Sequence, residues 1–382
     1  MARTMTRTDG NRHIPGLDLL RFFAAAMVMM FHLAYLDWVL PGSTAYRLSG
    51  GGLRFSELTA VSSFGWLGVQ IFFVISGFVI AYSAEGATPF SFIRSRALRL
   101  LPAAWICATL SFIIVNLSPT GPLSLGSYER SLVLWPFGPW VDPSFWTLGV
   151  EISFYALVGL LIAGGRFSAI LRLAIGLGAI SAAYWLAWWL SFTDAAGALH
   201  QWLLRHRESR LLELLLVQHG SFFALGVLLW SQLLKRETSG GRVGIAFLLL
   251  PCLLQIAAHH ALAEEKIGVA TALWPPLLIW LGAVAWMVVS IRYNARIAVN
   301  ERWRLRLRRI GLMTYPLYLI HQVIGCLLLG VLASAGLNRF VALAIAIAVV
   351  LTLANMVCSL FEPPLRAAMK HGFALVDRHA YH

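Results

Sequence analysis

The sequence predicts an all-α polytopic membrane protein with about ten transmembrane helices and no soluble domain. Hydrophobic residues make up 59% of its 382 positions and charged residues only 12%, about half the share found in soluble proteins. The 30 lysines and arginines outnumber the 17 acidic residues, but they lie between long apolar runs, which is typical of membrane proteins rather than of nucleic-acid-binding ones. These observations exclude a soluble enzyme, a disordered chain and a disulfide-stapled secreted domain.

The transmembrane helices are predicted from apolar stretches long enough to cross the hydrocarbon, which takes about 20 residues. Two stretches carry charges but are otherwise apolar over that length: residues 14–36, with Asp18 and Arg21, and residues 143–165, with Glu151. Eight more contain no Asp, Glu, Lys or Arg: 58–84, 100–128, 173–193, 214–234, 243–263, 267–291, 310–338 and 340–361. We therefore expect one transmembrane domain over residues 14–365.

The orientation follows from the basic residues, because basic loops are retained in the cytoplasm. With the N-terminus inside, 21 lysines and arginines fall on the cytoplasmic side and 8 on the other. We therefore expect both termini, residues 1–13 and 366–382, to be cytoplasmic tails. Segment 199–213 runs against the rule, since it places three arginines outside.

Ionisable side chains within predicted spans are costly and usually functional, which makes Asp18, Arg21, His32, Glu151 and His321 the first candidates. Arg21 and His32 are 11 residues apart, so on a helix they share one face, about 20° apart in azimuth and about 16 Å apart along the axis. Asp18 lies three residues before Arg21, where it can satisfy the guanidinium.

His32 and Glu151 are expected at similar depths in the outer half of the membrane, by counting about 1.5 Å per residue from Pro15 and Pro143. An imidazole and a carboxylate at one depth suit a general base and its orienting partner. The alternatives remain open: a neutral histidine bonded to a backbone carbonyl, and a structural carboxylate.

A third cluster, Arg94, Arg96 and Arg99, lies at the predicted entrance of the third span. Guanidinium pairs suit phosphate groups through bidentate hydrogen bonds, although such arginines also serve as topology anchors. His321, near Tyr318, fits a polar packing position better than a catalytic one. The four cysteines lie in apolar runs without CxxC-type spacing, so we expect no metal site.

Five strings occur in an order that resembles the acyltransferase-3 family of integral membrane acyltransferases. They are IPGLDLLRFFAAAMVMMFH (14–32), GVQIFFVISGFVI (68–80), FIRSRALRLLP (92–102), FWTLGVEISFYAL (145–157) and IGLMTYPLYLIHQ (310–322). The resemblance implies transfer of an acyl group, most often acetyl, from cytoplasmic acyl-CoA to a hydroxyl of a cell-surface or lipid-linked glycan, or of another acceptor.

The resemblance also implies roles for individual residues. His32 and Glu151 would be catalytic. Arg21, Arg96, Arg99, Ser76 and Gly77 would bind acyl-CoA. Beside these, we expect supporting roles for Asp18, Arg94, Tyr155, Tyr318 and His321. Family members often carry a second acidic residue after the glutamate, where this chain has Ile152.

The expected mechanism docks the phosphates of acetyl-CoA at Arg96 and Arg99 and lets His32, oriented by Glu151, deprotonate the acceptor. Acetyl-CoA would be a donor substrate, with no bound cofactor, no metal and no nucleic acid, in a bacterial cytoplasmic (inner) membrane. The rival hypothesis is a secondary transporter or lipid-linked-sugar carrier that uses Arg21 and Glu151 to bind substrate and protons. The acceptor, the acyl chain length, a possible acyl-enzyme and the oligomeric state are not predicted.

Overall fold

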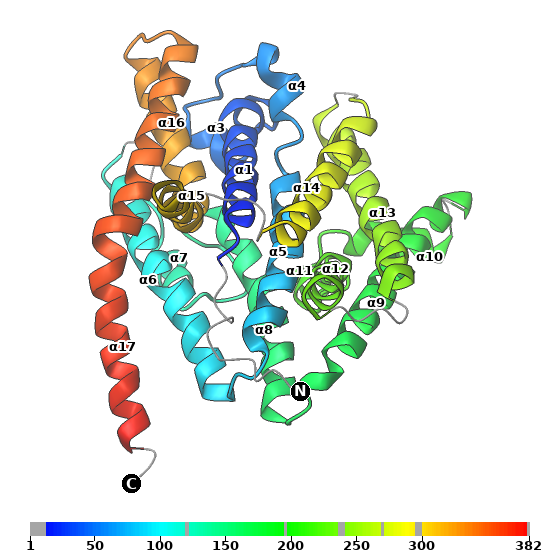
Figure 1. Ribbon diagram of the computed structural model, residues 1–382. Coiled ribbons are helices and arrows are strands. Elements are labelled where there is room, and N and C mark those ends of the chain that lie inside the picture. Colours follow the sequence, from blue (N-terminus) through cyan, green and yellow to red (C-terminus); the bar gives the residue numbers. More distant parts are fainter. Residues whose placement is uncertain are drawn as a thin grey trace.

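The computed structural model describes residues 13–118, 122–194, 197–235, 241–268, 271–294 and 300–379, and in these the fold is helical without a strand (Figure 1). The long helices are α1 (Pro15–Phe31), α5 (Leu67–Ala84), α6 (Pro89–Asn116), α8 (Trp146–Ala163), α9 (Ile170–Ser191), α13 (Gly241–Ile267), α14 (Trp274–Arg292), α15 (Glu301–Ser334), α16 (Arg339–Met356) and α17 (Glu362–His379). Shorter ones are α2 (Asp37–Val39), α3 (Thr44–Leu48), α4 (Thr59–Ser62), α7 (Leu125–Leu132), α10 (Ala198–His206), α11 (Arg210–Leu214) and α12 (Gly220–Trp230).

Nine helical segments of the described chain are long and apolar enough to cross a membrane, so the polytopic all-α fold is confirmed. The predicted span at 214–234 is the exception in length. Its helix, α12 continued by a π-helical turn, runs from Gly220 to Lys235 and so rises about 24 Å, less than the hydrocarbon thickness of about 30 Å. Every residue of α12 itself is buried, so neighbouring helices rather than lipid surround it.

Close backbone contact joins α12 to α5, the most buried of the long spans. A Cβ on Gly77 would lie 2.1 Å from the carbonyl oxygen of Phe223, and one on Gly226 would lie 2.1 Å from that of Val74. Both glycines are therefore required by helix packing, which small residues permit in membranes. The prediction that Gly77 admits the donor substrate is replaced by this packing role.

Helix α1 ends in a π-helical turn that begins at His32 and runs to Leu36. Such turns insert an extra residue into a helix and are frequent at functional sites. Helix α1 packs between α5, α14 and α15, so Arg21 and His32 lie inside the bundle.

Helix α6 begins earlier than the charge-free stretch predicts, because Thr88 and Ser91 form a capping box around Pro89 at the first turn. Arg94, Arg96 and Arg99 therefore lie within the helix rather than at its entrance. At the other end of the chain, α16 and α17 form one continuous helical segment, Arg339–Leu375, and α17 runs beside α6 (Figure 1). The described part of the predicted C-terminal tail is thus helical, while residues 1–12 and 380–382 lie outside the described chain.

Candidate active site

Three cavities follow one another through the bundle, and neighbouring cavities share wall residues. A basic pocket of about 450 Å³ lies at the N-terminal ends of α1 and α6. It shares Arg21, Arg96 and Arg99 with a central passage of about 110 Å³. The passage in turn shares Val69 and Tyr318 with a polar chamber of about 540 Å³, which reaches His32.

Cations dominate the basic pocket. Its six basic side chains are Arg21, Arg96, Arg99, Arg308, Arg366 and Lys370, and Asp18 is the carboxylate among its described lining residues. Arg21 donates to Asp18 at 3.2 Å, and Arg366 pairs with Glu362. The excess of positive charge makes this pocket suited to a polyanion.

Aromatic rings hold two of these arginines in place. The Arg96 guanidinium carbon lies 5.8 Å from the centroid of the Phe92 ring and 5.9 Å from that of Tyr155. Arg99 lies 5.7 Å from the Tyr315 ring. Stacking fixes a guanidinium plane while leaving its N–H groups available for bidentate contacts with an anion.

Glu151 lies in the wall of the central passage and accepts two hydrogen bonds. Ser76 donates to one carboxylate oxygen, and the Tyr155 hydroxyl donates to the other at 3.0 Å. The rest of the wall is largely apolar and aromatic, with Phe72, Phe73, Tyr315 and Tyr318. The passage is therefore narrow and mostly apolar, and it contains one carboxylate, that of Glu151, which two hydrogen bonds hold in place.

His32 is bonded to His321, and the hydrogen bonds of the two rings settle where their protons lie. The Nδ1 of His321 is 2.8 Å from the Tyr318 carbonyl oxygen, and the Nδ1 of His32 is 2.9 Å from the Val28 carbonyl oxygen. A carbonyl only accepts, so both Nδ1 atoms carry a proton. The single Nδ1 proton of His32 is then shared between the Val28 carbonyl oxygen and the Nε2 of His321, which lies 2.9 Å away, and in the neutral ring His32 Nε2 retains its lone pair.

His32 lines the polar chamber, whose wall is rich in tryptophan and amide side chains. The polar and aromatic members of the wall are Trp66, Gln70, Trp146, Trp185, Gln218, His219, Gln255, His259, Tyr318 and Gln322. Its charged members balance, with Arg207 and Lys266 against Glu208 and Glu213. Lys266 donates to Glu208 and lowers the pKa of that carboxyl.

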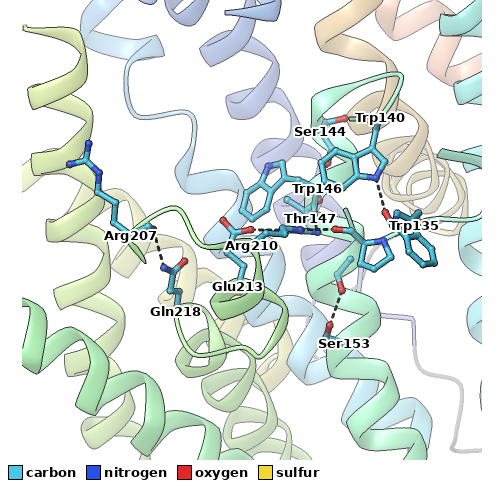
Figure 2. Close-up of polar contacts among 12 residues, drawn as sticks. Trp135, Trp140, Ser144, Trp146, Thr147, Ser153, Arg207, Arg210, Glu213 and Gln218 are labelled. Atoms are coloured by element: carbon cyan, nitrogen blue, oxygen red, sulfur yellow. Dashed lines mark hydrogen bonds and ion pairs between the residues drawn. The ribbon is translucent and has the colours of Figure 1, made fainter. Parts of the chain in front are cut away.

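Arg210 clamps the chamber wall together, as Figure 2 shows. It donates to the carbonyl oxygens of Pro136 at 2.7 Å and Trp146 at 2.8 Å, and to Glu213 at 2.7 Å. Burial raises the pKa of Glu213, and the ion pair with Arg210 opposes that shift. One guanidinium thus fixes the start of α8, which carries Glu151, against α11.

Asp142 ties the start of α8 to α15 on the other side of the chamber. Its carboxylate accepts from the backbone N–H groups of Ser144 at 2.8 Å and Val323 at 3.1 Å. Burial raises the pKa of Asp142 to about 6. The contact on Val323 lies two residues from His321, so it fixes the helix segment that holds the histidine pair.

The structure brings most of the predicted site residues together, but not as the sequence paired them. Asp18, Arg21, Arg96 and Arg99 line the basic pocket, and Ser76, Glu151, Tyr155 and Tyr318 line the passage. The hydrogen bonds described for His32 go to Val28 and His321, and those for Glu151 come from Ser76 and Tyr155. The expected His32–Glu151 contact is therefore replaced by a His32–His321 contact.

Two further predicted residues lie apart from the cavities. Gly77 packs against α12, and Arg94 lies over the Phe90 ring at 5.9 Å, outside the described walls of the three cavities. Sequence reasoning missed Arg308, Arg366 and Lys370, and it missed the glutamines of the chamber. Intramembrane Gln70, Gln255 and Gln322 were a usable signal, because polar side chains in spans are rare.

A half-buried histidine, His32, lies at the end of a passage through a helical membrane bundle, opposite a basic pocket. This arrangement defines a polytopic membrane protein with an enzyme-like site. The family model described as an acyltransferase domain matches residues 14–361, nearly the whole chain. The chain therefore belongs to the acyltransferase-3 family, and the resemblance seen in its motifs is confirmed.

Relatives in this family support a polysaccharide acyltransferase class. Nodulation protein 10 of Rhizobium leguminosarum bv. viciae is 30% identical over 186 residues, 42% of this chain and 47% of that protein. The O-acetyltransferase OatA of Staphylococcus aureus (strain NCTC 8325 / PS 47) is 27% identical over 175 residues, 40% of this chain and 25% of OatA.

The exopolysaccharide production protein ExoZ of Rhizobium meliloti (strain 1021) is 34% identical over 105 residues, 24% of this chain and 33% of ExoZ. The chain thus spans less than half the length of each of these three relatives. No solved structure matches the chain.

Proposed function

We propose that this protein is a membrane O-acyltransferase. It moves an acyl group, with acetyl as the preferred group, from cytoplasmic acyl-CoA to a hydroxyl of a cell-surface or lipid-linked glycan. The observation that carries the proposal is the series of three cavities, basic at one end and charge-balanced at the other, with His32 at the balanced end. The names of OatA and ExoZ, an O-acetyltransferase and an exopolysaccharide production protein, support the reaction and the acceptor class.

The donor end of the site is the basic pocket. Coenzyme A carries a pyrophosphate and a 3′-phosphate on its nucleotide, and arginine is the side chain that best matches phosphate oxygens. Arg21, Arg96 and Arg99 stand where the pocket meets the passage, so the phosphates dock there and the pantetheine arm extends inward. Glu151 accepts an N–H of the arm's amides, in addition to its bonds from Ser76 and Tyr155.

The chemical step takes place where the passage opens into the chamber. His32 Nε2 removes the proton of the acceptor hydroxyl, and the hydroxyl oxygen attacks the thioester carbonyl carbon. The tetrahedral intermediate collapses with cleavage of the carbon–sulfur bond, and the coenzyme A thiolate takes the proton back from His32. The products are the acyl ester and coenzyme A.

His321 acts as a positioning residue in this scheme. Its Nε2 accepts the Nδ1 proton of His32, which keeps the Nε2 lone pair of His32 toward the chamber. This is the orienting role that the sequence assigned to Glu151. Glu151 serves the donor arm instead.

The orientation of the protein is part of the proposal. The excess of arginine on one side supports a bacterial cytoplasmic membrane with both termini in the cytoplasm. The basic pocket then opens to the compartment that contains acyl-CoA, and the chamber faces the glycan outside.

The test is release of coenzyme A by purified protein in lipid nanodiscs supplied with acetyl-CoA and a neutral oligosaccharide. We expect thiol release matched mole for mole by acetylated sugar in the mass spectrum. Uptake of labelled sugar into proteoliposomes without acetylation would instead support the transporter hypothesis and refute the enzyme.

A further inference from the structure

The six cations of the basic pocket fall into an inner and an outer group. The inner group, on α1 and α6, lines both the pocket and the central passage and consists of Arg21, Arg96 and Arg99. The outer group, on α15 and α17, lines the pocket but not the described wall of the passage, and consists of Arg308, Arg366 and Lys370. These three, here called the outer cations, therefore lie on the side of the pocket away from the passage.

A side cavity of about 230 Å³ adjoins the pocket at the outer cations. The two cavities share Leu312, Arg366 and Lys370. The rest of the described wall of the side cavity consists of Cys358, Glu362, Pro363 and Ala367. Its one described carboxylate, that of Glu362, pairs with Arg366. The outer cations thus border a small space in which apolar surface lies next to positive charge.

Helical spacing directs the outer cations toward the same opening. Arg366 and Lys370 are four residues apart on α17, so their side chains share one face of that helix. Arg308 lies four residues before Leu312 on α15, and Leu312 lines both cavities. Helix α17 runs beside α6 (Figure 1), which carries two of the inner arginines. The last two helices of the pocket therefore supply a second group of cations next to the first.

Positive charge around the two cavities exceeds negative charge by four. Six cations line them against two carboxylates, those of Asp18 and Glu362, when His13 is counted as neutral. No ion pair is described for Arg308 or Lys370, so no described carboxylate neutralises them. Coenzyme A carries about four negative charges, two on its pyrophosphate and about two on its 3′-phosphate monoester. The inner arginines alone do not account for this match, because the surplus includes the outer cations.

The covalent order of the donor decides which phosphate meets which group. The pantetheine arm is attached to the pyrophosphate, so a donor whose arm enters the passage brings its pyrophosphate to the inner arginines. The 3′-phosphate and the adenine lie beyond it on the ribose, and so they fall on the side of the outer cations. Arginine and lysine both bind phosphate groups, and the apolar wall of the side cavity suits the faces of a purine.

We propose that the outer cations form a separate phosphate subsite that binds the 3′-phosphate of the donor, with the adenine ring in the side cavity. This inference rests on the proposed acyl transfer and narrows its donor. The substrate is the free coenzyme A thioester. Thioesters of 3′-dephospho-coenzyme A and of the phosphopantetheine arm of an acyl carrier protein are excluded as efficient donors, because neither has a 3′-phosphate.

The first arm of the test measures binding to the wild-type protein in phosphatidylcholine nanodiscs by calorimetry. The ligands are acetyl-CoA and its 3′-dephospho analogue. We expect acetyl-CoA to bind at least about tenfold more tightly, the size of one charge-assisted hydrogen bond. The difference should persist in nanodiscs that also contain phosphatidylglycerol. Equal affinities would overturn the subsite, and loss of the difference in the anionic nanodiscs would assign the outer cations to lipid headgroups instead.

The second arm replaces the two outer cations for which no ion pair is described, by Arg308→Gln and Lys370→Gln. Both side chains are exposed, so each variant is expected to weaken acetyl-CoA binding by about three- to tenfold, less than a buried charge would. Affinity for the 3′-dephospho analogue should stay at the wild-type value, because that ligand lacks the group that these cations bind. Arg366 is left in place, since its removal would strip the buried Glu362 of its ion pair.

Arg306→Gln is the matched control for these variants. Arg306 lies on the same helix as Arg308, with its guanidinium carbon 5.1 Å from the centroid of the Trp303 ring, and outside the described walls of both cavities. The substitution removes one positive charge, as the test variants do. It should leave the affinities for both ligands unchanged.

The pair of ligands separates the possible failures. Equal losses for both ligands in Arg308→Gln and Lys370→Gln, or a matching loss in Arg306→Gln, would overturn the subsite, since the cations would then act through general charge. Unchanged acetyl-CoA affinity in both test variants would overturn it as well. Failure of the wild-type protein to bind either ligand would refute acyl-CoA as the donor and with it the proposed function. Binding of both without discrimination would refute the subsite alone.

Discussion

The basic pocket and the polar chamber use their charges in opposite ways. In the pocket, Arg21 pairs with Asp18 and Arg366 with Glu362, whereas no ion pair is described for the other four of the six cations, so positive charge is in excess. In the chamber, Arg207 pairs with Glu265 at 3.2 Å, Lys266 with Glu208, and Arg210 with Glu213 at 2.7 Å. A cation that is paired holds the fold, whereas a surplus of cations recruits an anion.

This contrast explains why segment 199–213 departs from the rule for basic loops. Two of its three arginines, Arg207 and Arg210, pair with acidic side chains, and Arg210 also donates to two backbone carbonyls, as Figure 2 shows. The rule counts the arginines in each loop and takes no account of the acidic side chains or carbonyls that they contact. The paired arginines of the chamber therefore do not contradict the orientation that the unpaired ones support.

The largest effect is expected at the catalytic base. His32→Ala should lower kcat by about 10²- to 10⁴-fold, because it removes the group that takes the acceptor proton. Acetyl-CoA affinity, measured by calorimetry, should stay near the wild-type value, since His32 lies in the chamber.

His206 provides a matched control for that variant. Its Nδ1 bonds the Trp202 carbonyl oxygen four residues earlier at 2.8 Å, as His32 does with Val28, but it lies outside the described cavity walls. His206→Ala should retain activity. Near wild-type turnover in His32→Ala would show that His32 is not the catalytic base.

The next effect concerns the donor end. Arg96→Ala combined with Arg99→Ala should weaken acetyl-CoA binding by about 100-fold or more, since each charge-assisted hydrogen bond contributes about 1.5–3 kcal/mol. Arg94→Ala, on the same helix but outside the cavities, should bind acetyl-CoA normally. Equal losses in both proteins would show that the helix acts through general charge and not through the pocket.

A smaller effect is expected when the paired arginine of the chamber is changed. Arg210→Lys keeps the charge but cannot satisfy two carbonyls and a carboxylate with one planar group. Each polar group left unsatisfied costs about 1–3 kcal/mol, so thermal unfolding in detergent should begin at a lower temperature. Arg205→Lys on α10 is the control. A fully stable Arg210→Lys protein would contradict the clamp.

The smallest effect is expected at the positioning residue. His321→Leu should lower kcat by about tenfold to 100-fold, because a misplaced catalytic group loses rate steeply. His321→Gln should recover part of that loss, since its amide oxygen can accept the His32 Nδ1 proton. A purely packing role for His321 would give no recovery by glutamine and no change in the pH profile of kcat.

The parts of the fold that depend on local pattern could be predicted from the sequence. Apolar length predicted the spans, and the spacing of Arg21 and His32 predicted that they share the inner face of α1. The length of the α12 span could not be predicted. The chain turns at Leu216, whose φ is 60°, and Gln218 and Ser221 just after this turn are hydrogen-bonded to α9. These tertiary contacts leave no signal in the apolar pattern from which the span was predicted.

The site was predictable as a set of residues but not as a set of contacts. The order of the motifs predicted His32, His321 and Glu151 as polar residues of the site. Depth along a helix does not determine, however, whether His32 contacts Glu151 or His321. Gly77 shows the same limit, since a glycine that admits a ligand and one that admits a helix look alike in sequence. Arg366 and Lys370 were missed because the C-terminal segment was expected to be a tail.

The central claim, that donor and acceptor enter from opposite ends of one passage, is tested most directly in sealed vesicles of uniform orientation. Acetyl-CoA supplied on the side of the basic pocket should acetylate an impermeant oligosaccharide held on the side of the chamber. The reverse placement of the two substrates should give no product. Acetylation with both substrates confined to the side of the basic pocket would contradict transfer through the membrane.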